Sequence, residues 1–115
     1  MKVKTTAARG ELWWAYLDPV VGSEQGGRRP VLVVSRDEYN DSAVGRVVIV
    51  AVTSSDRGWP TSVAIDASCG LGRASWALAD QIRAIDNQRL RRRIGVVDAE
   101  TMAGVEDVIR RLLYA

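Results

Sequence analysis

The sequence predicts a mainly β domain of the α+β class, in which a small antiparallel sheet or barrel precedes one C-terminal helix. Short apolar segments of strand length recur over residues 11–97, with glycine-, proline- and serine-rich turns between them. No long helical pattern separates these segments, so parallel βαβ units are not expected. Apolar residues take up a sustained helical spacing only over residues 98–113.

The first half of the chain divides into strands and polar connections. Residues 11–19 predict a strand of about six residues that ends in a turn at Asp18-Pro19. The polar loop 20–29 follows, and Pro30 then opens the apolar strand 30–35. Residues 36–45 are a polar connection with room for one helical turn. The continuous apolar run 46–54 predicts a central strand covered on both faces.

Residues 54–97 carry weaker signals. The turn 54–60 leads to an edge strand at 61–66, and the turn-rich link 67–73 follows. Residues 74–86 fit either one helix or two short strands that meet around Ala79-Asp80, and we favour the strands. Residues 87–93 predict a short helical turn, and residues 94–97 a closing strand.

The C-terminal helix has clear start and stop signals. Asp98 is a good N-cap, and Glu100 lies in the first turn, where the helix dipole favours an anion. Arg110 and Arg111 lie near the C-terminal end, which favours cations. The apolar residues repeat at helical spacing: Met102, Val105, Val108, Ile109, Leu112 and Leu113.

We expect one domain over residues 1–115, with residues 1–8 as a flexible tail, because 115 residues suit a single core. No apolar run approaches ~18 residues, so no membrane partner is expected. Cys69 is the only cysteine, which fits a reducing cytoplasm. The chain has no histidine and no Cys/His cluster, so we expect neither a metal nor a cofactor.

The net charge is only +2, but arginine supplies 14 of the 16 positive residues. The planar guanidinium suits phosphate and base edges better than the ammonium of lysine does. The run Arg91, Arg92 and Arg93 is either a solvated face or a phosphate track, and we assign it no role.

Several candidate site residues stand at predicted strand ends. The loop 20–29 is either a solvated hairpin or a glycine-rich flap whose amides approach a phosphate. Arg29 is better positioned than Arg28 because Pro30 and the strand behind it restrain it. Thr53 and Ser54 end an apolar run, either as turn caps or as hydroxyl donors to a ligand.

The tryptophans offer stacking surfaces. Trp13 and Trp14 are adjacent, so in a strand they face opposite sides, one toward the core and the other available to a base, and Trp14 is the candidate for stacking on RNA. Trp59 lies in a turn, where less core is available to it, and is the second candidate.

Together these pieces resemble the MazF/PemK toxins of bacterial toxin–antitoxin systems. The resemblance rests on "RGELWWAYLDPVVGSEQGGRRPVLVVS", "VAVTSS", "GWP", "LADQIRAIDNQRL" and "IG", and it covers about residues 9–113. It implies a small SH3-like β-barrel with a C-terminal helix, CcdB/PemK-like in architecture, that acts as a homodimer. It also implies a metal-independent, sequence-specific endoribonuclease that cuts single-stranded RNA, mRNA above all, and so stops growth. The implied products are a 2′,3′-cyclic phosphate and a 5′-hydroxyl, and the implied inhibitor is a cognate antitoxin with an acidic segment.

The resemblance also assigns residues. The family's catalytic arginine falls on Arg29 and its catalytic threonine on Thr53. Ser23, Glu24 and Gln25 fall in the substrate-contacting loop, and Asp80, Gln81 and Arg83 fall on a motif near the RNA groove. Glu24 is in addition the candidate proton acceptor, because a carboxylate can serve as a general base. We keep two alternatives: a CcdB-like gyrase poison and a non-catalytic SH3-like binding module.

Overall fold

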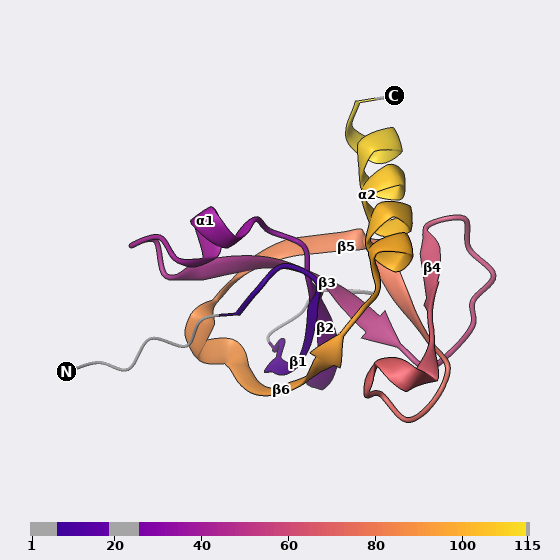
Figure 1. Ribbon diagram of the computed structural model, residues 1–115, viewed down its shortest axis with the longest axis horizontal. Coiled ribbons are helices and arrows are strands. Elements are labelled where there is room, and N and C mark those ends of the chain that lie inside the picture. Colours follow the sequence, from indigo (N-terminus) through magenta and orange to yellow (C-terminus); the bar gives the residue numbers. More distant parts are fainter. Residues whose placement is uncertain (1–6, 19–25, 115) are drawn as a thin grey trace.

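The structure, a computed structural model, describes residues 7–18 and 26–114 (Figure 1). Its strands are β1 (Glu11–Tyr16), β2 (Arg28–Val33), β3 (Arg46–Thr53), β4 (Ser62–Ile65), β5 (Ser75–Asp86) and β6 (Leu90–Val96). The helices are α1 (Asp37–Asn40) and α2 (Ala99–Leu113), and two 3₁₀ turns are η1 (Ala67–Cys69) and η2 (Asn87–Arg89).

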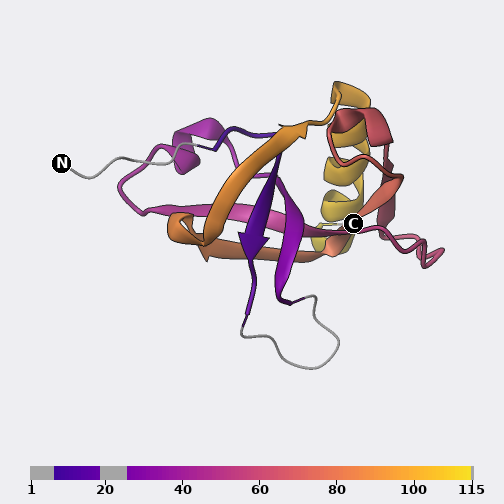
Figure 2. The same cartoon turned by 90° about the horizontal axis from the view of Figure 1, so that it is seen from below.

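The strands form one antiparallel sheet in the order β4-β5-β3-β2-β1-β6. Strand β3 lies near its middle and contributes apolar side chains to a core on each face. One core joins residues of β5 to Leu90 of β6, although three strands separate β5 from β6 in the sheet order. The sheet therefore curls around that core, and β6 can be seen curving past β1 in Figure 2. The predicted mainly β fold with a C-terminal helix is confirmed.

Helix α2 covers the other core at one end of the sheet. It packs against β4 and β5 and buries Met102 and Val105 (Figure 1). The side chain of Asp98 accepts a hydrogen bond from the amide of Thr101 at 2.8 Å, as expected of an N-cap. Hydrogen bonds from the hydroxyl and the amide of Thr101 lower the pKa of Asp98 below its ordinary value.

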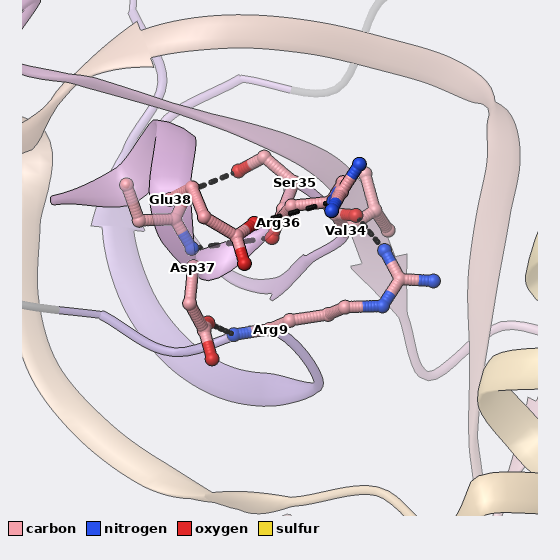
Figure 3. Close-up of polar contacts among 7 residues, drawn as sticks. Arg9, Val34, Ser35, Arg36, Asp37 and Glu38 are labelled. Atoms are coloured by element: carbon pink, nitrogen blue, oxygen red, sulfur yellow. Dashed lines mark hydrogen bonds and ion pairs between the residues drawn. The ribbon is translucent and has the colours of Figure 1, made fainter. Parts of the chain in front are cut away.

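Arg9 ties the start of the chain to the rest of the fold (Figure 3). Its amide donates to Asp37 of α1 at 2.8 Å, and its guanidinium contacts the carbonyl of Val34 and the carboxylate of Glu106 on α2. Ala7, two residues earlier, is fully buried in the core inside the curled sheet. The predicted tail is therefore wrong for residues 7 and 8, while residues 1–6 lie outside the described residues.

Three predicted boundaries need correction. Strand β2 begins at Arg28, not at Pro30, because its first two residues pair with Tyr16 and Ala15 of β1. Residues 75–86 form one strand with a shift of register against β3, where two short strands were predicted. The helical turn predicted for 87–93 ends at residue 89, and residues 90–93 belong to β6.

Candidate functional site

A cavity of about 410 Å³ opens where β2 begins and β3 ends. Antiparallel pairing places the start of β2 beside the end of β3, since Val31 of β2 lies opposite Ala51 of β3. The lining residues are mostly polar or basic and come from β1, β2, β3, β5 and the link before β5: Trp14, Arg28, Arg29, Pro30, Val52, Thr53, Ser54, Leu71, Arg73 and Ser75. Five residues predicted from the sequence thus meet in one cavity: Trp14, Arg28, Arg29, Thr53 and Ser54.

Arg29 is held by its own loop. Its Nε donates to the carbonyl of Gly26 at 2.9 Å, so one edge of the guanidinium is anchored to the backbone. A guanidinium carries five N–H donors, and those on the two Nη atoms have no hydrogen-bond partner among the described residues. The side chain thus offers a fixed cation with a donor fork toward the cavity.

Thr53 presents a hydroxyl at the cavity wall. The residue is only 5% exposed, and its Oγ1 accepts the amide of Ser55 at 3.1 Å. A hydroxyl that accepts a hydrogen bond keeps its own proton to donate. Thr53 can therefore both close the turn after β3 and donate to a ligand, so the two predicted roles are compatible.

Trp14 forms an apolar and aromatic side of the cavity. It lies opposite Pro30 of β2, and Trp13 packs instead against the core inside the sheet, so the two tryptophans face opposite sides as predicted. The Arg28 guanidinium lies 5.2 Å from the centre of the Trp14 ring, a cation–π distance. One ring face is thus covered by a cation.

Arg73 lines the cavity although the sequence analysis gave it no role. The link 67–73, which carries Arg73, lies directly against the backbone of β6. A Cβ added to Gly95 of β6 would lie 1.9 Å from the carbonyl oxygen of Cys69, and a Cβ added to Gly70 would lie 2.6 Å from the carbonyl oxygen of Ile94. The two glycines allow this close backbone approach, which places Leu71 and Arg73 at the cavity.

The electrostatics of the cavity favour an anion. Three guanidinium groups line it, and its lining residues within the described ranges include neither aspartate nor glutamate. Guanidinium groups bind phosphate through paired, charge-assisted hydrogen bonds. The cavity therefore suits a phosphodiester whose charge increases during a reaction.

Comparison with known proteins identifies the family. Residues 8–113 match the model of the PemK-like, MazF-like toxin of type II toxin–antitoxin systems. The chain belongs to this toxin family. It is 42% identical over 104 residues to the endoribonuclease EndoA of Bacillus subtilis, with 89% of this chain and 90% of the relative covered. It is 39% identical over 108 residues to the endoribonuclease MazF9 of Mycobacterium tuberculosis, with 89% and 92% covered.

Solved structures of MazF toxins share the fold. The crystal structure of MazF from Deinococcus radiodurans matches with a TM-score of 0.87 and 33% identity, over 96% of this chain and 99% of that one. A MazE-MazF structure from the same organism matches with a TM-score of 0.79 and 32% identity, over 95% and 97%. The resemblance drawn from the sequence, and the fold it implied, are confirmed.

Four further residues that the sequence analysis assigned to RNA are not among the described residues that line the cavity: Trp59, Asp80, Gln81 and Arg83. Trp59 is 47% exposed in its turn, with the Arg57 guanidinium 5.3 Å from its ring centre. Asp80 and Gln81 lie where β5 shifts register against β3, and Arg83 donates to the carbonyl of Leu17 at 3.2 Å. Ser23, Glu24 and Gln25, which were also predicted to contact substrate, lie outside the described residues.

The described ranges, 7–18 and 26–114, hold no group of three or more His, Cys, Asp or Glu residues arranged around a possible metal ion. They also hold no helix with the length and apolar character needed to cross a membrane.

Proposed function

We propose that this toxin is a metal-independent, sequence-specific endoribonuclease that cuts single-stranded RNA, and that the scissile phosphate binds between Arg29 and Thr53. The observation that carries the proposal is the meeting of these two side chains in one basic cavity. Relatives that are 42% and 39% identical carry the name endoribonuclease. Membership of the toxin family fits RNA cleavage as the means of stopping growth.

The reaction is an internal transfer at phosphorus. The 2′-hydroxyl oxygen of the RNA forms a bond to the adjacent phosphorus and gives its proton to a base. The bond from phosphorus to the 5′-oxygen breaks, and that oxygen takes up a proton. The products are a 2′,3′-cyclic phosphate and a 5′-hydroxyl end, and no water is consumed.

The described residues supply charge stabilisation to this step. Extra negative charge collects on the non-bridging oxygens as phosphorus becomes five-coordinate. The Nη donors of Arg29, which have no partner among the described residues, bind these oxygens more tightly in the transition state than in the ground state, which lowers the barrier. Thr53 donates its hydroxyl proton to one oxygen, and Arg73 neutralises phosphate charge at the cavity wall.

Two groups are proposed to transfer protons in this reaction, one in the loop 20–29 and the other the guanidinium of Arg29. Glu24 is the proposed acceptor of the 2′-hydroxyl proton, and Arg29 can donate to the leaving 5′-oxygen. Arg28, Trp14 and Ser54 contact the neighbouring nucleotides from the cavity, as do Ser23 and Gln25 from the loop. Base edges of single-stranded RNA are free to be read in this way.

The partners follow from the type II class. The toxin is paired with a cognate antitoxin protein in such a system, and the solved relatives include a MazE-MazF structure. An extended acidic segment of the antitoxin would compete with RNA for the three arginines of the cavity. We further propose that the toxin acts as a homodimer in the cytoplasm.

Cleavage of a purified RNA tests the proposal. The full-length protein is incubated with a labelled single-stranded oligonucleotide pool in EDTA, without gyrase, and new 5′-hydroxyl ends are mapped. We expect cleavage by the wild type and a rate ~100 to 1,000-fold lower for Arg29→Ala, the loss typical of one charge-stabilising donor. Arg46→Ala is the matched control, because Arg46 is exposed at the opposite end of β3 from Thr53. Unchanged cleavage by Arg29→Ala would overturn the assignment, and absence of RNA cleavage by the wild type would favour the CcdB-like or the non-catalytic alternative.

A further inference from the structure

Two arginines that lie more than 60 residues further along the chain bind the backbone at the end of β1. Nη1 of Arg83, on β5, donates to the carbonyl of Leu17 at 3.2 Å. Nη1 of Arg89, on η2, donates to the carbonyl of Tyr16 at 3.1 Å and also contacts that of Asp18. Charge-assisted hydrogen bonds of this kind are stronger than those between neutral groups. The end of β1 is therefore fixed from the side, by β5 and η2.

The end of β1 in turn holds the residues that precede β2. The amide of Leu17 donates to the carbonyl of Gly27 at 2.9 Å. The amide of Gly27 donates to Oδ1 of Asp18 at 2.8 Å. Gly27 is thus fixed to Leu17 and Asp18 by one backbone and one side-chain hydrogen bond, and Gly26 precedes it in the same peptide unit.

Gly26 completes the connection to the cavity, because its carbonyl accepts the Nε–H of Arg29. A continuous series of hydrogen bonds therefore runs from Arg83 and Arg89, through Leu17 and Asp18, to the guanidinium of Arg29. Arginine loses much rotamer freedom when it is fixed, and a group that is already fixed before substrate binds avoids that cost during the reaction.

We propose that Arg83 and Arg89 are positioning residues that set the orientation of Arg29, and that they do not themselves contact RNA. This inference rests on the proposed role of Arg29 in RNA cleavage. It replaces the RNA-contacting role that the family resemblance gave to Arg83. The half-buried Arg83 does not line the cavity, and its Nη1 is already engaged with Leu17.

The two roles predict different changes in Arg83→Gln. A positioning residue changes the geometry of Arg29, so kcat should fall about 10-fold, because small misplacements of a catalytic group are costly, while KM stays within about 2-fold. A phosphate-contacting residue would instead raise KM and reduce the salt dependence of binding by about one unit of slope. Arg89→Gln should behave like Arg83→Gln, and Arg83→Lys, which keeps a cationic donor, should recover part of kcat.

Amide hydrogen exchange measured by NMR gives a readout that does not depend on cleavage. We expect the amides of Leu17 and Gly27 to exchange at least about 10-fold faster in Arg83→Gln, because the hydrogen bonds on both sides of the anchor loosen. Arg46→Gln, an exposed arginine at the far end of β3, is the matched control and should leave exchange and kinetics unchanged. Melting curves confirm that each variant is folded at the assay temperature.

The outcomes separate this inference from the proposed function. Absence of RNA cleavage by the wild type would overturn the proposed function and the catalytic part of this inference. Unchanged amide exchange in both arginine variants would overturn the anchoring itself, whether or not the protein cleaves RNA. Faster exchange with an unchanged kcat, or a change confined to KM and salt slope, would overturn the positioning of Arg29. A fall in kcat together with faster exchange would support the proposal.

Discussion

The link 67–73 and β6 approach each other so closely that only glycine fits at residue 95. In Gly95→Ala the new Cβ would lie 1.9 Å from the carbonyl oxygen of Cys69. A carbon and a carbonyl oxygen in contact need about 3.3 Å, so β6 and the link 67–73 must move apart by about 1.4 Å. The obstacle is backbone and cannot rotate away as a flexible side chain could.

This displacement should lower both stability and activity. Overpacking of this kind costs about 2 kcal/mol, and for a chain of 115 residues each kcal/mol lowers Tm by about 4 °C. We therefore expect Tm to fall by about 8 °C. Because the link carries Leu71 and Arg73 to the cavity, the cleavage rate of the folded protein should also fall, by about 10-fold or more.

Gly104→Ala supplies the matched control. Gly104 lies within α2, and an added Cβ would meet only one methyl group of Val63, at 3.3 Å, so a shift of a few tenths of an ångström relieves the contact. Alanine is also favoured over glycine inside a helix by about 0.5–1 kcal/mol. Calorimetry should give a Tm within about 4 °C of the wild type, and RNA cleavage should be unchanged. If Gly95→Ala melts and cleaves as Gly104→Ala does, the packing of the link against β6 neither stabilises the fold nor places Arg73 at the cavity.

Three further changes test the cavity and the fold. Arg73→Gln should weaken the binding of an RNA whose scissile 2′-hydroxyl is replaced by hydrogen and reduce the salt slope by about one, which titrations at several salt concentrations would measure; an unchanged slope would argue against a phosphate contact. Trp14→Ala should weaken the same binding by about 1–3 kcal/mol if a base stacks there, and an unaltered Kd would reject stacking. Burial raises the pKa of Glu11, but hydrogen bonds from the amide of Ala8 and from Arg93 outweigh it, so its folded pKa lies below the ordinary 4.5. Its stabilisation is therefore complete above about pH 5 and lost as the pH falls through the folded pKa. Glu11→Gln should lower Tm at pH 7 and flatten the acid limb of a Tm-against-pH curve, and an acid limb as steep as that of the wild type would contradict this.

Sequence patterns predicted an element correctly where neighbouring residues alone determine its structure. The apolar run of β3 and the cap and spacing of α2 are properties of neighbouring residues, and both elements were predicted correctly. Residues 90–93 were not, because "LRRR" has no alternating apolar pattern and becomes a strand only by pairing with β1. The pairing partner lies more than 70 residues away in sequence, beyond the reach of any local pattern.

The same distinction explains the site. Arg29 and Thr53 could be predicted because each stands at the end of a recognisable strand, and antiparallel pairing brings such ends together. Arg73 could not, because the short turn-rich link that carries it is placed by the approach of Gly70 and Gly95, which only the folded chain reveals. In the sequence, the close contact was indicated only by the two glycines themselves, Gly70 in "CGLGR" and Gly95 in "RIGVV".

The arginines show why residue type alone did not locate the site. Fourteen arginines in 115 residues are suited to phosphate groups, but several of them have their guanidinium groups engaged by the protein itself: Arg9, Arg83, Arg89 and Arg93. Arg93 is paired with Glu11, whereas Arg28, Arg29 and Arg73 line a cavity without a lining carboxylate in the described ranges. A guanidinium that is already paired gains little from a phosphate, while one held by a single edge keeps its donors for the substrate. Hydrogen-bond partners thus distinguish the arginines that are bound within the fold from those that face the cavity, and the larger fall in rate expected for Arg29→Ala than for Arg83→Gln tests that distinction.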